Sequence, residues 1–156
     1  RPQAPARLRR DGLGRLHDLR AQDERLVAGE QHPVAGGGAP VACAFPEGTS
    51  VLSGPDELRV KDSDRIALMV DGLRACGVDV DERPDGMVIE GRGPGGVRGG
   101  AEIETHGDHR IAMSFLVLGS AAQNPVAVKD ADMIATSFPG FSGFMAGLGA
   151  DIQDAP

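Results

Sequence analysis

Residues 57–65, ELRVKDSDR, bring two cations and two carboxylates into the five positions 61–65, at a predicted junction between a strand and a helix. The apolar residues at positions 66, 69, 70 and 73 have the spacing of one helix face. Ser63 or Asp62 is the natural N-cap of this helix. Lys61 and Arg65 therefore flank a helix N-terminus, where free N–H groups and the helix dipole favour an anion. A capped helix with solvated charges is the simpler alternative.

A similar arrangement occurs again 45 residues later: residues 64–69 read DRIALM and residues 109–113 read HRIAM. Each copy places an Arg in the first turn of a helix, where a cation opposes the dipole at a cost of up to ~1 kcal/mol. Such exceptions to local preference are expected where a site requires them. If the two N-termini converge, their cations would form an anion pocket: Lys61, Arg65, His109 and Arg110.

Each residue type suggests a role in such a pocket. Arg suits bidentate contacts to carboxylate or phosphate, whereas Lys acts as a mobile point charge. Asp62 and Asp64 would orient the cations, and a carboxyl group near them could shuttle protons. Alternatively, the repeat reflects only a repeated fold unit whose charges pair with one another. The spacing leaves both interpretations open.

Composition narrows the class of protein. The chain has 156 residues, about one domain, and a net charge of −7 with five Phe and no Trp or Tyr, which argues against nucleic-acid binding. No apolar run approaches the length of a membrane span. The two cysteines, Cys43 and Cys76, lack metal-ligand spacing and are predicted to be free thiols, which fits a reducing cytoplasm. The Gly-rich stretch 91–100 matches neither a dinucleotide fingerprint nor a P-loop.

Periodicity and turn residues predict an alternation of strands and helices from residue 41 onward. The expected strands and hairpin lie at 49–54, 78–81 with 87–90, 101–104, 125–128 and 150–152. The expected helices lie at 64–76, along the buried face of residues 111–119 up to an end at Asn124-Pro125, and after a cap at Thr136-Ser137 with Pro139 in the first turn. Residues 1–39, with seven Arg and no Lys, are interpreted as poorly structured or at most one marginal helix.

Three ordered blocks resemble the 5-enolpyruvylshikimate-3-phosphate synthase family. Residues 57–66 resemble its ELRVKESDRI block, residues 105–115 resemble its block around DHR[IM]AM, and residues 133–139 resemble a third block before the last helix. The resemblance runs from about residue 41 to residue 152. The UDP-N-acetylglucosamine enolpyruvyl transferases share the fold but lack the first two blocks, and they remain the alternative family.

The resemblance implies an α/β fold, part of an inside-out α/β barrel of repeated βαβαββ units. It implies transfer of the enolpyruvyl group of phosphoenolpyruvate to the 5-hydroxyl of shikimate 3-phosphate, a step toward chorismate and the aromatic amino acids. The reaction would proceed by addition and elimination, with no metal and no cofactor. Lys61 would contact shikimate 3-phosphate near the reacting centre, and Arg65 and Arg110 would hold phosphoenolpyruvate. Asp62 would replace the family's proton-donating Glu, and His109 is the remaining candidate catalytic residue.

The chain also departs from the family pattern. Asp62 is one methylene shorter than the family's Glu, Thr136 stands where many members have a substrate-binding Lys, and Val34 stands where the catalytic Asp is expected. We therefore predict that residues 1–39 are a disordered or frame-shifted lead and that residues 40–156 are the C-terminal part of the domain. Such a fragment would lack the N-terminal domain and be inactive alone. The alternative is a non-catalytic remnant that binds anions.

Overall fold

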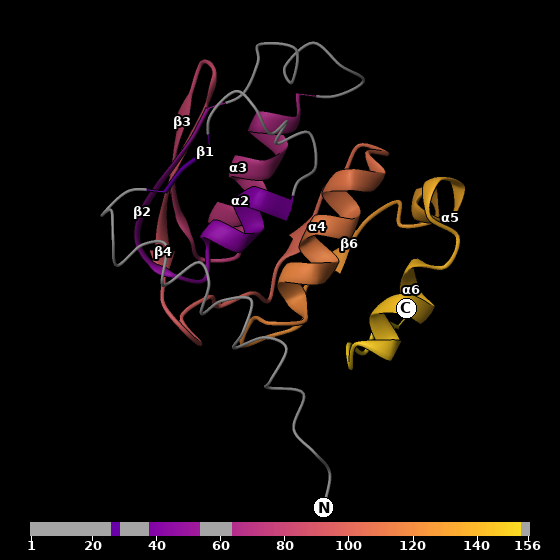
Figure 1. Cartoon of the computed structure of the whole chain (residues 1–156). Helices are drawn as coiled ribbons and strands as arrows, with labels where there is room; N and C mark the ends of the chain where they lie inside the picture. The colour runs from indigo at the N-terminus through magenta and orange to yellow at the C-terminus, as the bar shows by residue number, and fades with distance from the viewer. Residues whose placement is uncertain (1–25, 29–37, 54–63, 154–156) are drawn as a thin grey trace, which may run out of the picture.

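A four-stranded sheet and the helices packed on it form the first part of the described structure (Figure 1). The computed structural model describes residues 26–28, 38–53 and 64–153. The first six elements are β1 (Leu26–Ala28), α2 (Gly38–Cys43), β2 (Glu47–Ser53), α3 (Arg65–Ala75), β3 (Asp79–Arg83) and β4 (Gly86–Arg92). This order is one complete βαβαββ unit.

A second unit begins after β4. Its elements are β5 (Glu102–Ile103), α4 (His109–Gly119), β6 (Ala127–Val128), α5 (Met133–Ser137) and α6 (Phe141–Gly147). Strands β5 and β6 are parallel neighbours, with α4 connecting them. The repeated order confirms the predicted α/β fold built from repeated units.

The larger sheet has the strand order β1-β2-β4-β3. Strand β1 is parallel to β2, whereas β4 is antiparallel to both β2 and β3. Alternation along the strands directs one set of side chains inward, so Leu52 lies opposite Met87, and Ile89 opposite Val80, all of them buried. The hairpin predicted around residues 84–86 is confirmed by the β3–β4 pairing.

Helices α2 and α3 lie between this sheet and α4, and α5 and α6 lie beyond α4 (Figure 1). Helix α3 approaches α4 closely because Gly72 has no side chain: a Cβ atom added there would lie 2.2 Å from Cζ of Phe115. Phe115, Leu73 and Ile89 are fully buried. A smaller cluster joins α4 to α5 and α6: Ala112, Ile134, Phe141 and Met145. Among the described residues, every helix is too short or too polar to cross a membrane.

Three predicted boundaries were wrong. Helix α4 ends at Gly119 rather than at Asn124-Pro125, because the N–H groups of Gln123 and Asn124 instead donate to the carbonyl groups of Val97 and Arg98. The last helix, expected to begin after a cap at Thr136-Ser137 with Pro139 in its first turn, is α6 and begins at Phe141, whereas Thr136 and Ser137 lie at the end of the preceding helix α5. Proline disfavours the helical region for the residue before it, and Phe138 has φ −144° and ψ 77°. Residues 150–152 form no strand.

The structure also differs from expectation within residues 1–39. Strand β1 lies inside this segment and pairs with β2, and α2 begins at Gly38, before the expected boundary. The βαβαββ order needs β1 as its first strand. The division at residue 39 and the origin of the lead stay predictions.

Candidate functional site

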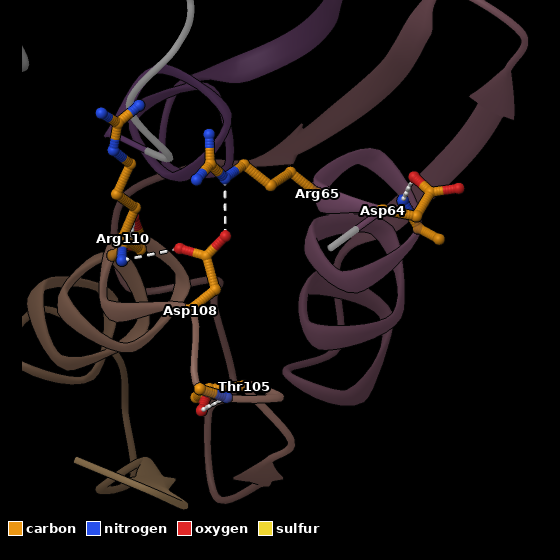
Figure 2. Close-up of polar contacts among 8 residues, drawn as sticks. Asp64, Arg65, Thr105, Asp108 and Arg110 are labelled. Atoms are coloured by element: carbon orange, nitrogen blue, oxygen red, sulfur yellow. Dashed lines mark hydrogen bonds and ion pairs between the residues drawn. The ribbon is translucent and has the colours of Figure 1, made fainter. Parts of the chain in front are cut away.

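The N-termini of α3 and α4 lie side by side and are joined by an ion pair (Figure 2). Arg65 is the first residue of α3, and Asp108 is the N-cap of α4. The Arg65 Nε atom lies 2.6 Å from Asp108 Oδ2, and the two side chains are only 14% and 3% exposed. The two helix starts identified from the sequence therefore do converge.

Each of these helices is capped by an aspartate. Asp64 Oδ1 accepts from the Ala67 N–H at 3.0 Å, and Asp108 Oδ1 accepts from the Arg110 N–H at 2.9 Å. Asp64 is thus the N-cap of α3, which corrects the expectation of Ser63 or Asp62. Asp108 uses its second oxygen for Arg65, so one carboxylate both caps α4 and holds the arginine of α3.

The two arginines reach the same region of the structure. In Figure 2 the guanidinium groups of Arg65 and Arg110 lie on the same side of Asp108. Arg65 contacts Asp108 through Nε, and one of its Nη atoms points away from that carboxylate (Figure 2). Two planar guanidinium groups beside two helix N-termini form an arrangement suited to a carboxylate or a phosphate.

A tight turn sets the start of α4. The Thr105 carbonyl accepts from the Asp108 N–H at 2.9 Å, and the two residues between them, His106 and Gly107, have φ values of 49° and 75°. Two consecutive left-handed residues reverse the chain after β5 and deliver Asp108 directly to the helix start. The side chain of His106 is therefore not part of the helix, whereas His109 is its first residue.

The third block lies next to this turn. A Cβ atom added at Gly107 would lie 3.7 Å from the Met133 Cε atom, and Ile134 packs in the cluster that contains Ala112 of α4. Thr136, the third-block position singled out from the sequence, is exposed on α5. The structure therefore brings parts of all three blocks together around the N-terminus of α4.

The predicted site residues fall into two groups. Arg65, His109 and Arg110 all lie in the first turns of α3 and α4. Lys61 and Asp62 lie outside the described residues. The two copies of the motif are offset by one position, because Arg65 is the first residue of its helix and Arg110 is the second residue of its own.

Sequence reasoning assigned no role to Asp108. The carboxylate that pairs with Arg65 is Asp108 on the other helix, whereas Asp64, the neighbour of Arg65, caps α3. The signal that could have identified Asp108 is its position directly before the helix. An aspartate there is a strong N-cap, and one carboxylate oxygen remains for a second contact.

Two places outside this junction contain side chains with a shifted pKa: Cys76, and the pair formed by Glu104 and Lys129. Burial raises the pKa of the Cys76 thiol from 9.0 to about 11. A hydrogen bond from Lys129 lowers the pKa of Glu104, and the carboxylates of Glu104 and Glu102 raise the pKa of Lys129. In the part of the chain that the structure describes, no three His, Cys, Asp or Glu side chains are grouped to hold a metal ion.

Comparison with known proteins gives a consistent result. Residues 30–145 match the model of the EPSP synthase (3-phosphoshikimate 1-carboxyvinyltransferase) family. The chain is 64% identical over 112 residues to a 3-phosphoshikimate 1-carboxyvinyltransferase of Phenylobacterium zucineum, covering 72% of this chain and 25% of that protein. It is 53% identical over 149 residues to that of Parvibaculum lavamentivorans, covering 91% and 33%.

The same similarity is found in three dimensions. A solved structure of EPSP synthase from Acinetobacter baumannii superposes with a TM-score of 0.72 at 42% identity, covering 77% of this chain and 28% of that one. The chain thus spans a quarter to a third of the length of the curated relatives that it matches.

Proposed function

The chain belongs to the EPSP synthase family, and we propose that it supplies part of the active site that transfers the enolpyruvyl group of phosphoenolpyruvate to shikimate 3-phosphate. The observation that carries the proposal is the Arg65–Asp108 junction, which joins two helix N-termini and holds one of two arginines in a fixed direction. The family assignment favours this activity over that of the UDP-N-acetylglucosamine enolpyruvyl transferases.

The chemistry requires that anions be held and that protons be moved. The 5-hydroxyl of shikimate 3-phosphate gives up its proton to a base as its oxygen attacks C2 of phosphoenolpyruvate, while C3 takes up a proton from an acid, which gives a tetrahedral intermediate. Loss of phosphate from C2 and of a proton from C3 then restores the enol ether. Both substrates are anionic, so preorganised cations lower the cost of bringing them together.

We assign roles to the site residues within this scheme. Arg65 and Arg110 would bind phosphoenolpyruvate through their planar guanidinium groups. Asp108 would hold Arg65 before the substrate arrives, so that less side-chain freedom is lost on binding. His109, at the first position of α4, is a candidate for proton transfer.

The roles of Lys61 and Asp62 rest on sequence alone. Lys61 would contact shikimate 3-phosphate, and Asp62 would donate a proton in place of the family's Glu. Its side chain is one methylene shorter than Glu, and a displacement of about 1 Å at a reacting centre can cost ~10²-fold in rate.

The remainder of the active site would come from the sequence that longer relatives possess. We propose that the chain works with a complementary N-terminal domain in the cytoplasm and that residues 40–156 belong to the C-terminal domain. The second candidate function, a non-catalytic anion-binding remnant, is favoured by the same arginines and differs only in turnover.

Phosphate release separates these two functions. The chain would be mixed with phosphoenolpyruvate and shikimate 3-phosphate, alone and with the separately expressed N-terminal domain of a relative. We expect turnover only in the mixture and its loss with Arg110→Ala, while Arg98→Ala, an exposed arginine away from the two helix starts, serves as the control. Binding of phosphoenolpyruvate without turnover in any mixture would support the remnant.

A further inference from the structure

The hydroxyl group of Thr105 ties the turn before α4 to the end of β6. Thr105 is fully buried. Its Oγ1 donates to the carbonyl of Lys129 at 2.9 Å and accepts from the Gly107 N–H at 3.3 Å. One hydroxyl therefore connects two chain segments that follow adjacent parallel strands.

The segments joined in this way are both conformationally constrained. His106 has φ 49°, and Asp130, which follows Lys129, has φ 53°. Residues other than glycine are uncommon in this left-handed region, and they persist there when the surrounding structure holds them. Thr105 directly precedes His106, and Lys129 directly precedes Asp130. The Thr105–Lys129 hydrogen bond is therefore adjacent to both left-handed residues and can hold both in place.

The turn leads directly to the carboxylate of the candidate site. The Asp108 N–H donates to the Thr105 carbonyl, which fixes the position of Asp108. The Asp108 carboxylate then caps α4 and contacts Arg65. A rotation of the turn would move the Asp108 carboxylate relative to α3 and weaken the 2.6 Å contact with Arg65. The Thr105 hydroxyl bonds to Lys129 and Gly107, so its effect on Arg65 passes through the turn and Asp108.

We infer that Thr105 is a positioning residue whose hydroxyl fixes the 105–108 turn and thereby the direction of Arg65. The identity of the anion that Arg65 binds rests on the proposed function, whereas the coupling between Thr105 and Arg65 does not. A merely structural role would lower stability throughout the chain, without a selective effect on the Arg65 side chain.

Hydrogen exchange of the Arg65 Nε–H, measured by NMR in the full chain without ligand, tests this coupling. In Thr105→Val we expect exchange about tenfold faster than in the parent, since the turn loses one buried hydrogen bond. The backbone amides of Leu73 and Ile89 should change much less. Thr105→Ser keeps the hydroxyl and should restore slow exchange.

Thr49→Val is the matched control, because the Thr49 hydroxyl donates to Glu90 at 3.0 Å across β2 and β4, away from the site. Unchanged Arg65 exchange in Thr105→Val, or an acceleration equal to that of the core amides, would overturn the inference. If Thr105→Val does not fold, Thr105→Ala takes its place, since it adds no methyl group against the Lys129 carbonyl. Loss of the fold in both would also overturn it, because Thr105 would then determine the fold rather than the site.

A second readout keeps this inference separate from the proposed function. Phosphoenolpyruvate affinity would be measured for the parent and for Thr105→Val under identical conditions. Absence of binding in the parent would count against the proposed function, and the exchange result would still decide the role of Thr105. Slow exchange in Thr105→Val alongside normal parent binding would overturn the positioning role alone.

Discussion

The starts of α3 and α4 carry the same Arg-Ile-Ala sequence but are built differently. Asp64 caps α3, and the arginine beside it extends to the other helix, where it contacts Asp108. Asp108 caps α4 and receives that arginine, and it comes after a turn braced by Thr105. One helix thus supplies a side chain that reaches across, and the other supplies its anchor. The same sequence motif therefore has a different structural role at each of its two positions.

The largest expected effect comes from removing that anchor. Asp108→Ala leaves Arg65, whose side chain is only 14% exposed, without this carboxylate, and removes the N-cap of α4. Breaking a buried pair on one side typically costs about 3–5 kcal/mol. Asp64→Ala should cost only about 0.5–2 kcal/mol, the usual range for an N-cap. Urea unfolding of both variants measures the difference, and equal losses would remove the distinction between the two helices.

The close approach of α3 and α4 is tested by Gly72→Ala. The added Cβ atom would lie 2.2 Å from the Phe115 ring, so the ring or the helices must shift, at an expected cost of about 1–3 kcal/mol. Gly143→Ala in α6 is the control: a Cβ atom there meets nothing within 4 Å, and the gain in helix propensity should stabilise by about 0.5–1 kcal/mol. A stabilised Gly72→Ala variant in thermal unfolding would contradict the observed packing.

The other end of α3 gives a smaller, pH-dependent effect. Cys76 is the C-cap of α3, and burial raises the pKa of its thiol from 9.0 to about 11. The folded state therefore retains the thiol proton to higher pH than the unfolded state, so stability present below pH 9.0 is lost as the pH rises toward about 11. The expected loss is at most about 2 kcal/mol.

The measurement is the free energy of unfolding from about pH 8 to about pH 11 for the parent and Cys76→Ala. The free energy of unfolding should decline more steeply in the parent than in the variant. Lysines titrate in both proteins, so the difference between the two curves isolates the contribution of Cys76. Parallel curves would show that burial of Cys76 does not shift its titration.

The smallest effect should come from Lys129→Ala. Lys129 pairs with Glu102 at 3.1 Å and with Glu104, but all three side chains are about half exposed or more. Solvent-exposed ion pairs contribute little to stability. The Thr105 contact at this residue uses the backbone carbonyl, which the substitution keeps. The melting temperature should stay within experimental scatter, whereas a large drop would mean that the β5–β6 pairing depends on these charges.

Local sequence patterns predicted most of the elements. The apolar spacing after residue 64 and the Pro84-Asp85-Gly86 turn each act within a few residues, so α3 and the β3–β4 hairpin were predicted. The end of α4 and the start of α6 were not, because they depend on pairing with residues 97–98 and on the constraint that Pro139 places on Phe138. Strand β1 was missed because three residues in a Gly- and Arg-rich segment carry little pattern.

The sequence indicated which cations lie at the starts of α3 and α4, but not the contacts that they make. The cations at two helix starts were visible as exceptions to the dipole preference, which led to Arg65 and Arg110. The partner of Arg65 was not visible, because a contact between positions 43 apart depends on how α3 and α4 pack. Asp64 was the nearer carboxylate in sequence, yet Asp108 is the one that the Arg65 Nε atom contacts.

The most direct test that the starts of α3 and α4 form one anion-binding pocket is calorimetry of phosphoenolpyruvate binding to the parent, Arg65→Ala and Arg110→Ala. If the two helix starts form one pocket, the parent binds and each variant loses at least about tenfold in affinity, since a charge-assisted contact is worth about 1.5–3 kcal/mol. Arg98→Ala should bind like the parent. Binding that survives in either site variant, or a parent that does not bind, would contradict a single pocket formed by α3 and α4.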